Sequence, residues 1–219
     1  MKLVFLHGLG QDAHSWQSVQ DALSPLPSDS FAIFSSPSES YQEAKERLTE
    51  CLQQESEPFI LVGLSLGGVL ALELSSQDLP HLKGLVLSGT QYKLKTNFLY
   101  RLQILLFRLL PKQVFEKQGA NKQHMLQILT ELKSLNLTDN AKTCPLPSLV
   151  ICGSKDKANQ ASSKKLANLL PKGHYLEIVD GGHTLNTQKP NELAQAIKEF
   201  VGEFKNEEAS LKNSSSQCR

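Results

Sequence analysis

The sequence predicts a doubly wound α/β fold, with a mostly parallel sheet of about six strands and a small helical insertion. Short runs of Val, Ile and Leu recur without polar alternation, which is typical of strands buried on both faces. Most of these runs are followed by a longer segment with helical periodicity. Residues 91–142 break this rhythm, because they contain two helical patterns and no candidate strand.

The elements follow one another in a regular order. The expected strands are Lys2–Leu6, Ser30–Phe34, Phe59–Val62, Leu82–Leu87, Ser148–Cys152 and Tyr175–Val179. The expected helices outside the insertion are Tyr41–Gln54, Leu66–Leu74, Ala161–Leu170 and a last one that begins near Pro190. We therefore expect one domain over residues 1–204, with the insertion at about 91–142 and a flexible polar tail over 205–219.

Composition and charge exclude several classes of protein. Hydrophobic residues make up 40% of the 219 residues, which is too much for a disordered chain. The 23 Lys and Arg nearly balance the 22 Asp and Glu without a basic cluster, so no nucleic-acid partner is expected. The densest apolar run, Phe98–Leu110, is too short to cross a bilayer as a helix.

Localisation and cofactors are predicted from what the sequence lacks. The first ten residues are too short an apolar segment for a secretory leader, and the four Cys form no CxxC pair. We therefore expect a cytoplasmic protein. No phosphate-binding loop and no His/Cys cluster with metal-ligand spacing is present, so we expect neither a cofactor nor a metal.

The strongest local signal is the segment Gly63–Gly68, GLSLGG. It follows a predicted strand and precedes a predicted helix, which is the context of a G-x-S-x-G nucleophile elbow. Such a sharp turn forces its central Ser65 into a sterically poor conformation, which glycines on either side make tolerable. Ser65 is therefore the candidate nucleophile, because the turn projects its hydroxyl at the carboxyl edge of the sheet.

A serine hydroxyl needs a neighbouring base, and two later loops supply candidates. Asp156 follows the strand Ser148–Cys152, and His183 follows the strand Tyr175–Val179. Both loops leave the same edge of a parallel sheet as Ser65. Asp180 is a competing acid on the loop of His183, but its place directly after the strand favours a turn residue. His174 is expected at the opposite edge, and His81 and His124 at the surface.

Acyl transfer also needs donors for the developing oxyanion. The N–H of Leu66 follows the nucleophile, and the loop His7–Gly10 after the first strand offers the N–H of Leu9. His7 is expected to make structural hydrogen bonds within this loop. Trp16 is a candidate for the mouth of the substrate pocket, with packing in the core as the alternative.

Together, His7-Gly8 after a strand, GLSLGG, Gly153-x-x-Asp156 and Gly182-His183 resemble the α/β-hydrolase superfamily, in its small esterase-like branch. The resemblance spans about Lys2–Phe204. It implies Ser65 as nucleophile, His183 as general base and acid, and Asp156 as the carboxylate that orients His183. It also implies that residues 91–142 form a cap domain. A serine at position 65 argues against dehalogenases and epoxide hydrolases of this fold, which use Asp there.

The insertion bears on the substrate. The segment Phe98–Leu110 is apolar around most of its helical circumference, which predicts packing on the core, a hydrophobic lid over Ser65, or a membrane-surface helix. For the lid, we expect Phe98 and Leu102 to contact substrate.

The sequence therefore predicts a serine hydrolase that cleaves a small-molecule carboxylic ester with a small to medium apolar acyl group. A lyase or carbon–carbon bond hydrolase of the same fold, and a binding protein that keeps the triad as a relic, are the alternatives.

Overall fold

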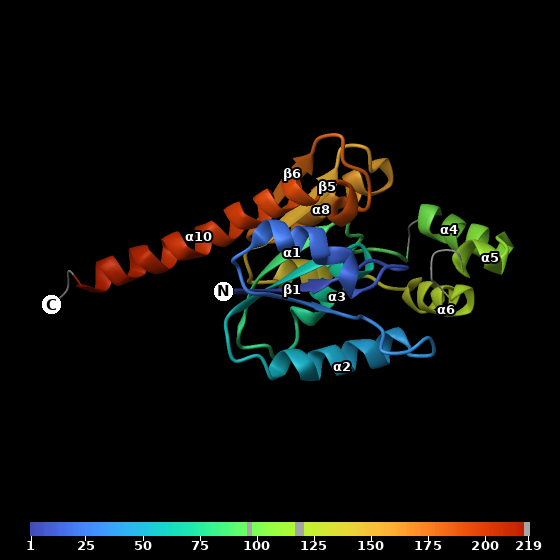
Figure 1. The fold of residues 1–219 in the computed structure, drawn as a ribbon, viewed down its shortest axis with the longest axis horizontal. Helices are drawn as coiled ribbons and strands as arrows, with labels where there is room; N and C mark the ends of the chain where they lie inside the picture. The colour runs from blue at the N-terminus through green and yellow to red at the C-terminus, as the bar shows by residue number, and fades with distance from the viewer. Residues whose placement is uncertain (96–97, 117–120, 217–219) are drawn as a thin grey trace.

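The structure is a computed structural model that describes residues 1–95, 98–116 and 121–216, with the backbone alone for 98, 99, 102, 103 and 205–216. Six strands form one fully parallel sheet: β1 (Lys2–Leu6), β2 (Ser28–Phe31), β3 (Phe59–Leu64), β4 (Leu82–Ser88), β5 (Ser148–Gly153) and β6 (Gly173–Ile178). Their spatial order is β2-β1-β3-β4-β5-β6 (Figure 1). This confirms the predicted doubly wound sheet of about six strands.

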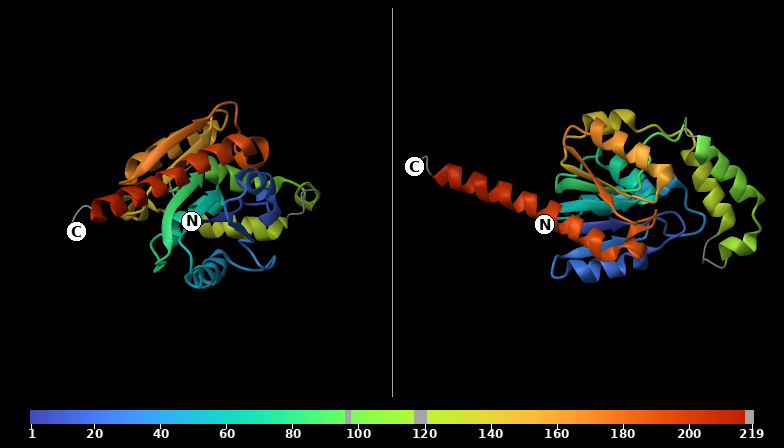
Figure 2. Two further views of the ribbon diagram at one scale, coloured as in Figure 1. Left: turned by 60° about the vertical axis from the view of Figure 1, so that its left-hand side comes forward. Right: turned by 90° about the horizontal axis from the view of Figure 1, so that it is seen from above.

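The sheet is covered by helices on both faces (Figure 2). Successive residues of β3 alternate between two cores, since Phe59 and Leu61 pack into one and Ile60 and Val62 into the other. The first core includes residues of α2 (Tyr41–Gln53), α3 (Leu66–Leu74) and α8 (Lys157–Leu169). The second includes residues of α1 (Gln17–Leu23), α9 (Leu185–Gln188) and α10 (Pro190–Ser216). Burial on both faces explains why the strands read as unbroken apolar runs.

The two edge strands differ most from the sequence prediction. The second strand was predicted at Ser30–Phe34, but β2 ends at Phe31. The chain leaves the sheet there, because the N–H of Ile33 donates to Nε2 of His7 instead of to a strand (3.1 Å). At the other edge, β6 covers Gly173–Ile178 instead of Tyr175–Val179, since Gly173 already pairs with Ser148. His174 therefore lies within β6 and not before it.

The insertion follows β4, and its described residues form four helices where the sequence suggested two. They are α4 (Phe98–Leu109), α5 (Lys112–Glu116), α6 (Lys122–Leu132) and α7 (Thr138–Thr143). The hydroxyl of Tyr100 on α4 donates to the carbonyl oxygen of Leu129 on α6 (2.8 Å), and this bond joins the two longest of them. The first three lie together at one end of the molecule, beyond the carboxyl edge of the sheet (Figure 1).

Two helix boundaries also needed tertiary information. Helix α8 begins at Lys157, four residues before the predicted Ala161, directly after the loop that holds Asp156. The backbone of α10 remains helical to Ser216, whereas the sequence prediction ended this helix at Phe204. The predicted flexibility of residues 205–219 stays a prediction. A short 3-10 helix, η1 (Ala13–Trp16), precedes α1.

Candidate active site

Ser65 occupies a sharp turn between β3 and α3. Its backbone angles, φ 53° and ψ −109°, lie outside the regions that residues with side chains normally adopt. The N–H of Ser65 donates to the carbonyl oxygen of Ser88 at the end of β4 (2.7 Å), and this bond helps to fix the strained turn. The sequence prediction of a sterically poor conformation at this residue is therefore met.

Glycines are required on both sides of this turn. A Cβ at Gly63 would collide with the backbone of Gly67, and a Cβ at Gly67 would collide with the backbone of Leu6 on β1. Helix α3 can therefore start directly against the sheet, with Ser65 held above its first turn. The first N–H groups of a helix have no carbonyl one turn earlier to bond, so they remain available as donors.

The imidazole of His183 contacts the carboxylate of Asp156, with 2.7 Å between Nδ1 and Oδ2. Asp156 is buried after β5 as the residue before α8, and His183 is half-exposed on the loop after β6. Because a carboxylate only accepts hydrogen bonds, Nδ1 carries the proton in this pair. Nε2 is then left as the imidazole atom that can accept a proton from another group.

The competing acid, Asp180, is directed elsewhere. Its side chain is two-thirds exposed and pairs with Nζ of Lys155 at 2.9 Å. The hydrogen bond and the charge of Lys155 lower the pKa of Asp180. Its φ of 59° is that of a tight turn, as the sequence interpretation of this residue expected. The geometry therefore favours Asp156 over Asp180 as the partner of His183.

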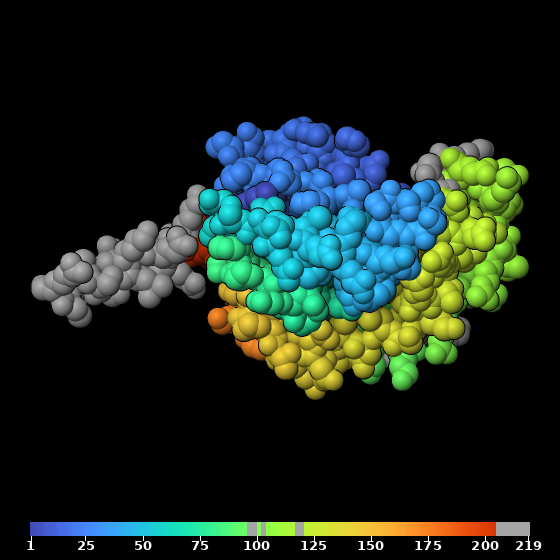
Figure 3. Space-filling model, turned by 90° about the horizontal axis from the view of Figure 1, so that it is seen from below, coloured from blue at the N-terminus to red at the C-terminus, as the bar shows by residue number. Residues whose placement is uncertain are grey.

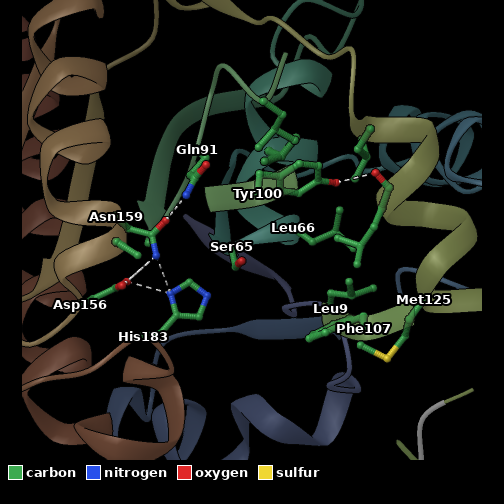
Figure 4. A pocket seen from close by; sticks show the side chains of 16 residues that line it. Leu9, Ser65, Leu66, Gln91, Tyr100, Phe107, Met125, Asp156, Asn159 and His183 are labelled. Atoms are coloured by element: carbon green, nitrogen blue, oxygen red, sulfur yellow. Dashed lines mark hydrogen bonds and ion pairs between the residues drawn. The ribbon is translucent and has the colours of Figure 1, made fainter. Parts of the chain in front are cut away.

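Asn159, in the first turn of α8, is a residue that sequence reasoning missed. Its Nδ2 lies 2.8 and 2.9 Å from the two carboxylate oxygens of Asp156, and 3.1 Å from Nδ1 of His183 (Figure 4). Its Oδ1 accepts from Nε2 of Gln91 at 2.7 Å. The two sets of bonds agree on the orientation of the amide. The reverse orientation would place its oxygen against the carboxylate of Asp156 and its nitrogen against the amide nitrogen of Gln91. Asn159 therefore holds both oxygens of the Asp156 carboxylate, next to the contact of that carboxylate with His183.

The only sequence signal for Asn159 was its spacing, three residues after Asp156 on a helix. Gln91 offered none, because it lies 68 positions away in sequence at the start of the insertion. The bond between these two amides links the entry to the insertion with the loop of Asp156.

Gly89, just after β4, was also missed. It has a φ of 54°, and a Cβ there would lie 3.0 Å from Cε1 and Nδ1 of His183. Contacts that short are rare for real Cβ atoms, so the imidazole of His183 can occupy this place only because residue 89 has no side chain. A glycine after a strand end was a visible signal, but it did not indicate which loop would pack against it.

Ser65, Asp156 and His183 line a common cavity of about 510 Å³. Its polar side chains gather at one end, where Gln91 and Asn159 join them (Figure 4). The rest of the wall is apolar and comes mainly from α3, α4 and α6 and the segment before α4: Leu66, Val69, Leu94, Tyr100, Phe107, Met125, Leu129 and Leu132. The insertion therefore contributes wall residues to the cavity that contains Ser65.

The two residues predicted to supply oxyanion donors, Leu9 and Leu66, also line this cavity. Leu9 lies on the loop after β1, in which the N–H of Gly8 donates to Oε1 of Gln11 (3.1 Å). His7 is buried below this loop, with Nδ1 2.9 Å from the carbonyl oxygen of Gly8. Burial lowers the pKa of His7. A neutral ring that donates through Nδ1 and accepts at Nε2 agrees with its expected structural role.

The structure does not confirm any of the three predicted substrate-contact residues, Trp16, Phe98 and Leu102, in the wall of this cavity. Trp16 was wrong as a pocket residue, because it is fully buried in the second core, where its ring packs 4.8 Å from that of Phe5. The turn η1 places it behind the sheet, away from Ser65. Phe98 and Leu102 lie on α4, but their side chains are outside the described part of the chain. Tyr100 and Phe107, on the same helix, do line the cavity.

A second hollow, of about 560 Å³, adjoins the first above β1 and β2 and shares Leu9 and Met125 with it. His124, expected at the surface, is partly buried here. Its Nε2 lies 2.7 Å from the carbonyl oxygen of Glu39, and its ring packs edge-on against Phe34. The prediction for His124 was wrong because α6 lies over the loop that follows β2.

Within residues 1–95, 98–116 and 121–216, no three His, Cys, Asp or Glu side chains gather as a metal site would require. Cys144 and Cys152 are buried and Cys51 is exposed. Burial raises the pKa of Cys152 to about 11, so its thiol stays protonated at neutral pH.

Comparisons with solved structures agree with the fold. MenH from S. aureus superposes with a TM-score of 0.77 at 20% identity, over 93% of this chain and 94% of that one. A thermophilic esterase from Thermogutta terrifontis gives 0.74 at 20% identity, over 93% and 90% of the two chains. An enol-lactonase from Burkholderia xenovorans LB400 gives 0.73 at 17% identity, over 92% and 91%. At these identities the similarity establishes the fold alone.

No curated protein matches the sequence significantly. The family model described as "Alpha/beta hydrolase family" matches residues 3–196, which include the strained Ser65 turn and the loops of Asp156 and His183. Since this match extends over most of the chain, the protein belongs to the alpha/beta hydrolase family.

Proposed function

We propose that this protein is a serine hydrolase that cleaves carboxylic esters with a small to medium apolar acyl group. The observation that carries the proposal is the hydrogen-bonded pair of His183 and Asp156 in the same cavity as Ser65, which sits on a strained turn. Strain at a residue that lines a cavity is typical of sites whose geometry serves function.

In the proposed reaction, Oγ of Ser65 attacks the ester carbonyl carbon while Nε2 of His183 takes the hydroxyl proton. Asp156 accepts the hydrogen bond from Nδ1 and stabilises the imidazolium that forms. His183 then protonates the leaving alcohol as the tetrahedral intermediate collapses to an acyl-enzyme. Water repeats the sequence, with His183 as its base, and releases the acid.

The negative charge of the tetrahedral intermediate needs fixed donors. We assign this role to the backbone N–H groups of Leu66 and Leu9. Support for Leu66 comes from its place as the first residue of α3, where its N–H is not used within the helix. Support for Leu9 comes from its position in the wall of the cavity that also contains Ser65.

The apolar acyl group is inferred from the cavity wall. Side chains such as Val69, Phe107 and Leu129 surround the space beyond Ser65, and burial of an acyl chain against them is favourable by about 25 cal/mol per Å². No Lys or Arg occurs among the described residues that line the cavity, so an acidic substrate would lack a partner for its charge. This favours an ester over the acidic substrates considered for a lyase or carbon–carbon bond hydrolase.

The test is hydrolysis of p-nitrophenyl esters of increasing acyl length, together with labelling by a fluorophosphonate. We expect turnover by the wild type, a labelled Ser65, and loss of both in Ser65→Ala with an unchanged thermal midpoint of unfolding. A folded wild-type protein that is not labelled would refute the hydrolase and favour a binding protein.

A further inference from the structure

Much of the solvent-facing side of α4 is apolar, whereas the solvent-facing side of an ordinary surface helix is polar. Ile104 and Tyr100 are buried on its inner face. On the outer face, Leu105 and Leu106 are each 51% exposed and Leu109 is 74% exposed. Leu110 and Val114 continue this exposed surface toward α5. We call these five residues the apolar patch.

Exposed large hydrophobic side chains are concentrated in the apolar patch and are rare elsewhere on the described surface. Among the described residues, seven large hydrophobic side chains are exposed, and five of them form the patch. The other two, Leu176 and Val179, lie on and after β6. Clusters of exposed apolar side chains of this kind mark sites of contact with another protein or with a lipid surface.

Cations border the apolar patch. Arg101, Arg108 and Lys112 are all exposed on α4 and α5. Within described residues 98–116, the one acid is Glu116, whose carboxylate lies 3.4 Å from Nζ of Lys112. Both partners are more than half exposed, so this pair is weak and leaves the surface positive.

The positive charge around the apolar patch indicates which kind of partner can cover the patch. A second copy of the chain that bound through the same patch would bring two positively charged surfaces together, which opposes self-association. An anionic lipid surface complements them, because its headgroups attract Lys and Arg while its acyl region accepts leucine side chains.

We propose that α4 and α5 dock this protein on anionic lipid bilayers, with the apolar patch in the interface and the cations at the headgroups. The insertion forms one end of the molecule, so its outer face can approach a flat surface (Figure 3). No described helix is long and apolar enough to span a membrane. The inner face of α4 carries Tyr100 and Phe107 into the wall of the Ser65 cavity, so docking would bring that cavity close to apolar esters in the lipid.

The test is co-sedimentation of the full-length protein with vesicles of phosphatidylcholine alone and of phosphatidylcholine with phosphatidylserine. We expect binding to the phosphatidylserine vesicles that weakens as salt rises. The pair Arg101→Gln and Arg108→Gln should lower the partition coefficient roughly 25-fold, from about 5-fold for each charge. The pair Leu106→Ser and Leu109→Ser should lower it by at least roughly tenfold.

The matched control is Leu176→Ser with Val179→Ser, which removes the two exposed apolar side chains outside the patch and should leave binding unchanged. Thermal unfolding of every variant checks its fold. Failure of the wild type to bind, equal binding to both kinds of vesicle, or unchanged binding by the leucine pair would each overturn the proposal. Light scattering that shows a dimer, without vesicle binding, would identify a second copy as the occupant. Vesicle binding needs no turnover, so this result is independent of the proposed hydrolase activity.

Discussion

Asn159 offers the sharpest test of how the Asp156–His183 pair is held. We consider Asn159→Leu, which keeps most of the side-chain volume but removes the amide that contacts both carboxylate oxygens of Asp156. The carboxylate then loses the donor that holds both of its oxygens, and it can rotate from the orientation that receives Nδ1.

The magnitude follows from the hydrogen bonds that this substitution removes. A hydrogen bond to a charged group contributes about 1.5–3 kcal/mol, and about 1.4 kcal/mol corresponds to a tenfold change in rate. If that loss falls on the transition state, in which Asp156 stabilises the imidazolium, kcat falls roughly 10- to 150-fold. KM should change little, because the amide contacts Asp156 and His183 and not the apolar wall.

The assay is steady-state hydrolysis of p-nitrophenyl esters, with the rate of fluorophosphonate labelling as a second measure of Ser65 reactivity. The matched control is Gln160→Leu, one residue along α8, whose amide bonds to Ser154 and Glu177 away from the cavity. Both variants lose a side-chain amide, but only Asn159→Leu should lose kcat. A loss confined to KM, or an equal loss in the control, would refute a positioning role.

Four further outcomes are expected. Asp156→Asn should lower kcat by roughly 10⁴-fold while Asp180→Asn stays near wild type, and the reverse order in the same ester assay would move the acid role to Asp180. Gly89→Ala should lower both stability and kcat, because a Cβ 3.0 Å from the imidazole of His183 must displace it; a crystal structure with an unmoved ring would contradict this. Phe107→Ala should shift the preferred p-nitrophenyl ester toward longer acyl chains by enlarging the cavity, and an unchanged profile would exclude Phe107 from the acyl site. Burial lowers the pKa of His7 from its ordinary 6.5, so the unfolded chain binds a proton that the folded chain does not as pH falls below that value. Urea unfolding should therefore show that wild type loses more stability than His7→Gln between pH 7.5 and 5.5, and equal losses would contradict it.

The sequence alone determined the parallel sheet and the turn at Ser65. Both depend on local information, because a strand buried on two faces must be apolar throughout and a sharp turn must have glycines where backbones meet. The location of Ser65, Asp156 and His183 at one cavity could also be predicted, since parallel strands end at one edge of the sheet and each of these residues follows a strand.

Tertiary packing decided the rest. The ends of β2 and β6 depend on which partner takes each backbone N–H, and the bond from Ile33 to His7 is invisible in either segment alone. Trp16 was assigned to the pocket because of its nearness in sequence to the loop of Leu9, but the turn of η1 sends it to the other face of the sheet. The hydrogen bond between the amides of Gln91 and Asn159 joins residues that are 68 positions apart in sequence. Such contacts depend on how the helices pack on the sheet. That packing is determined by all the packed side chains together and not by any local pattern.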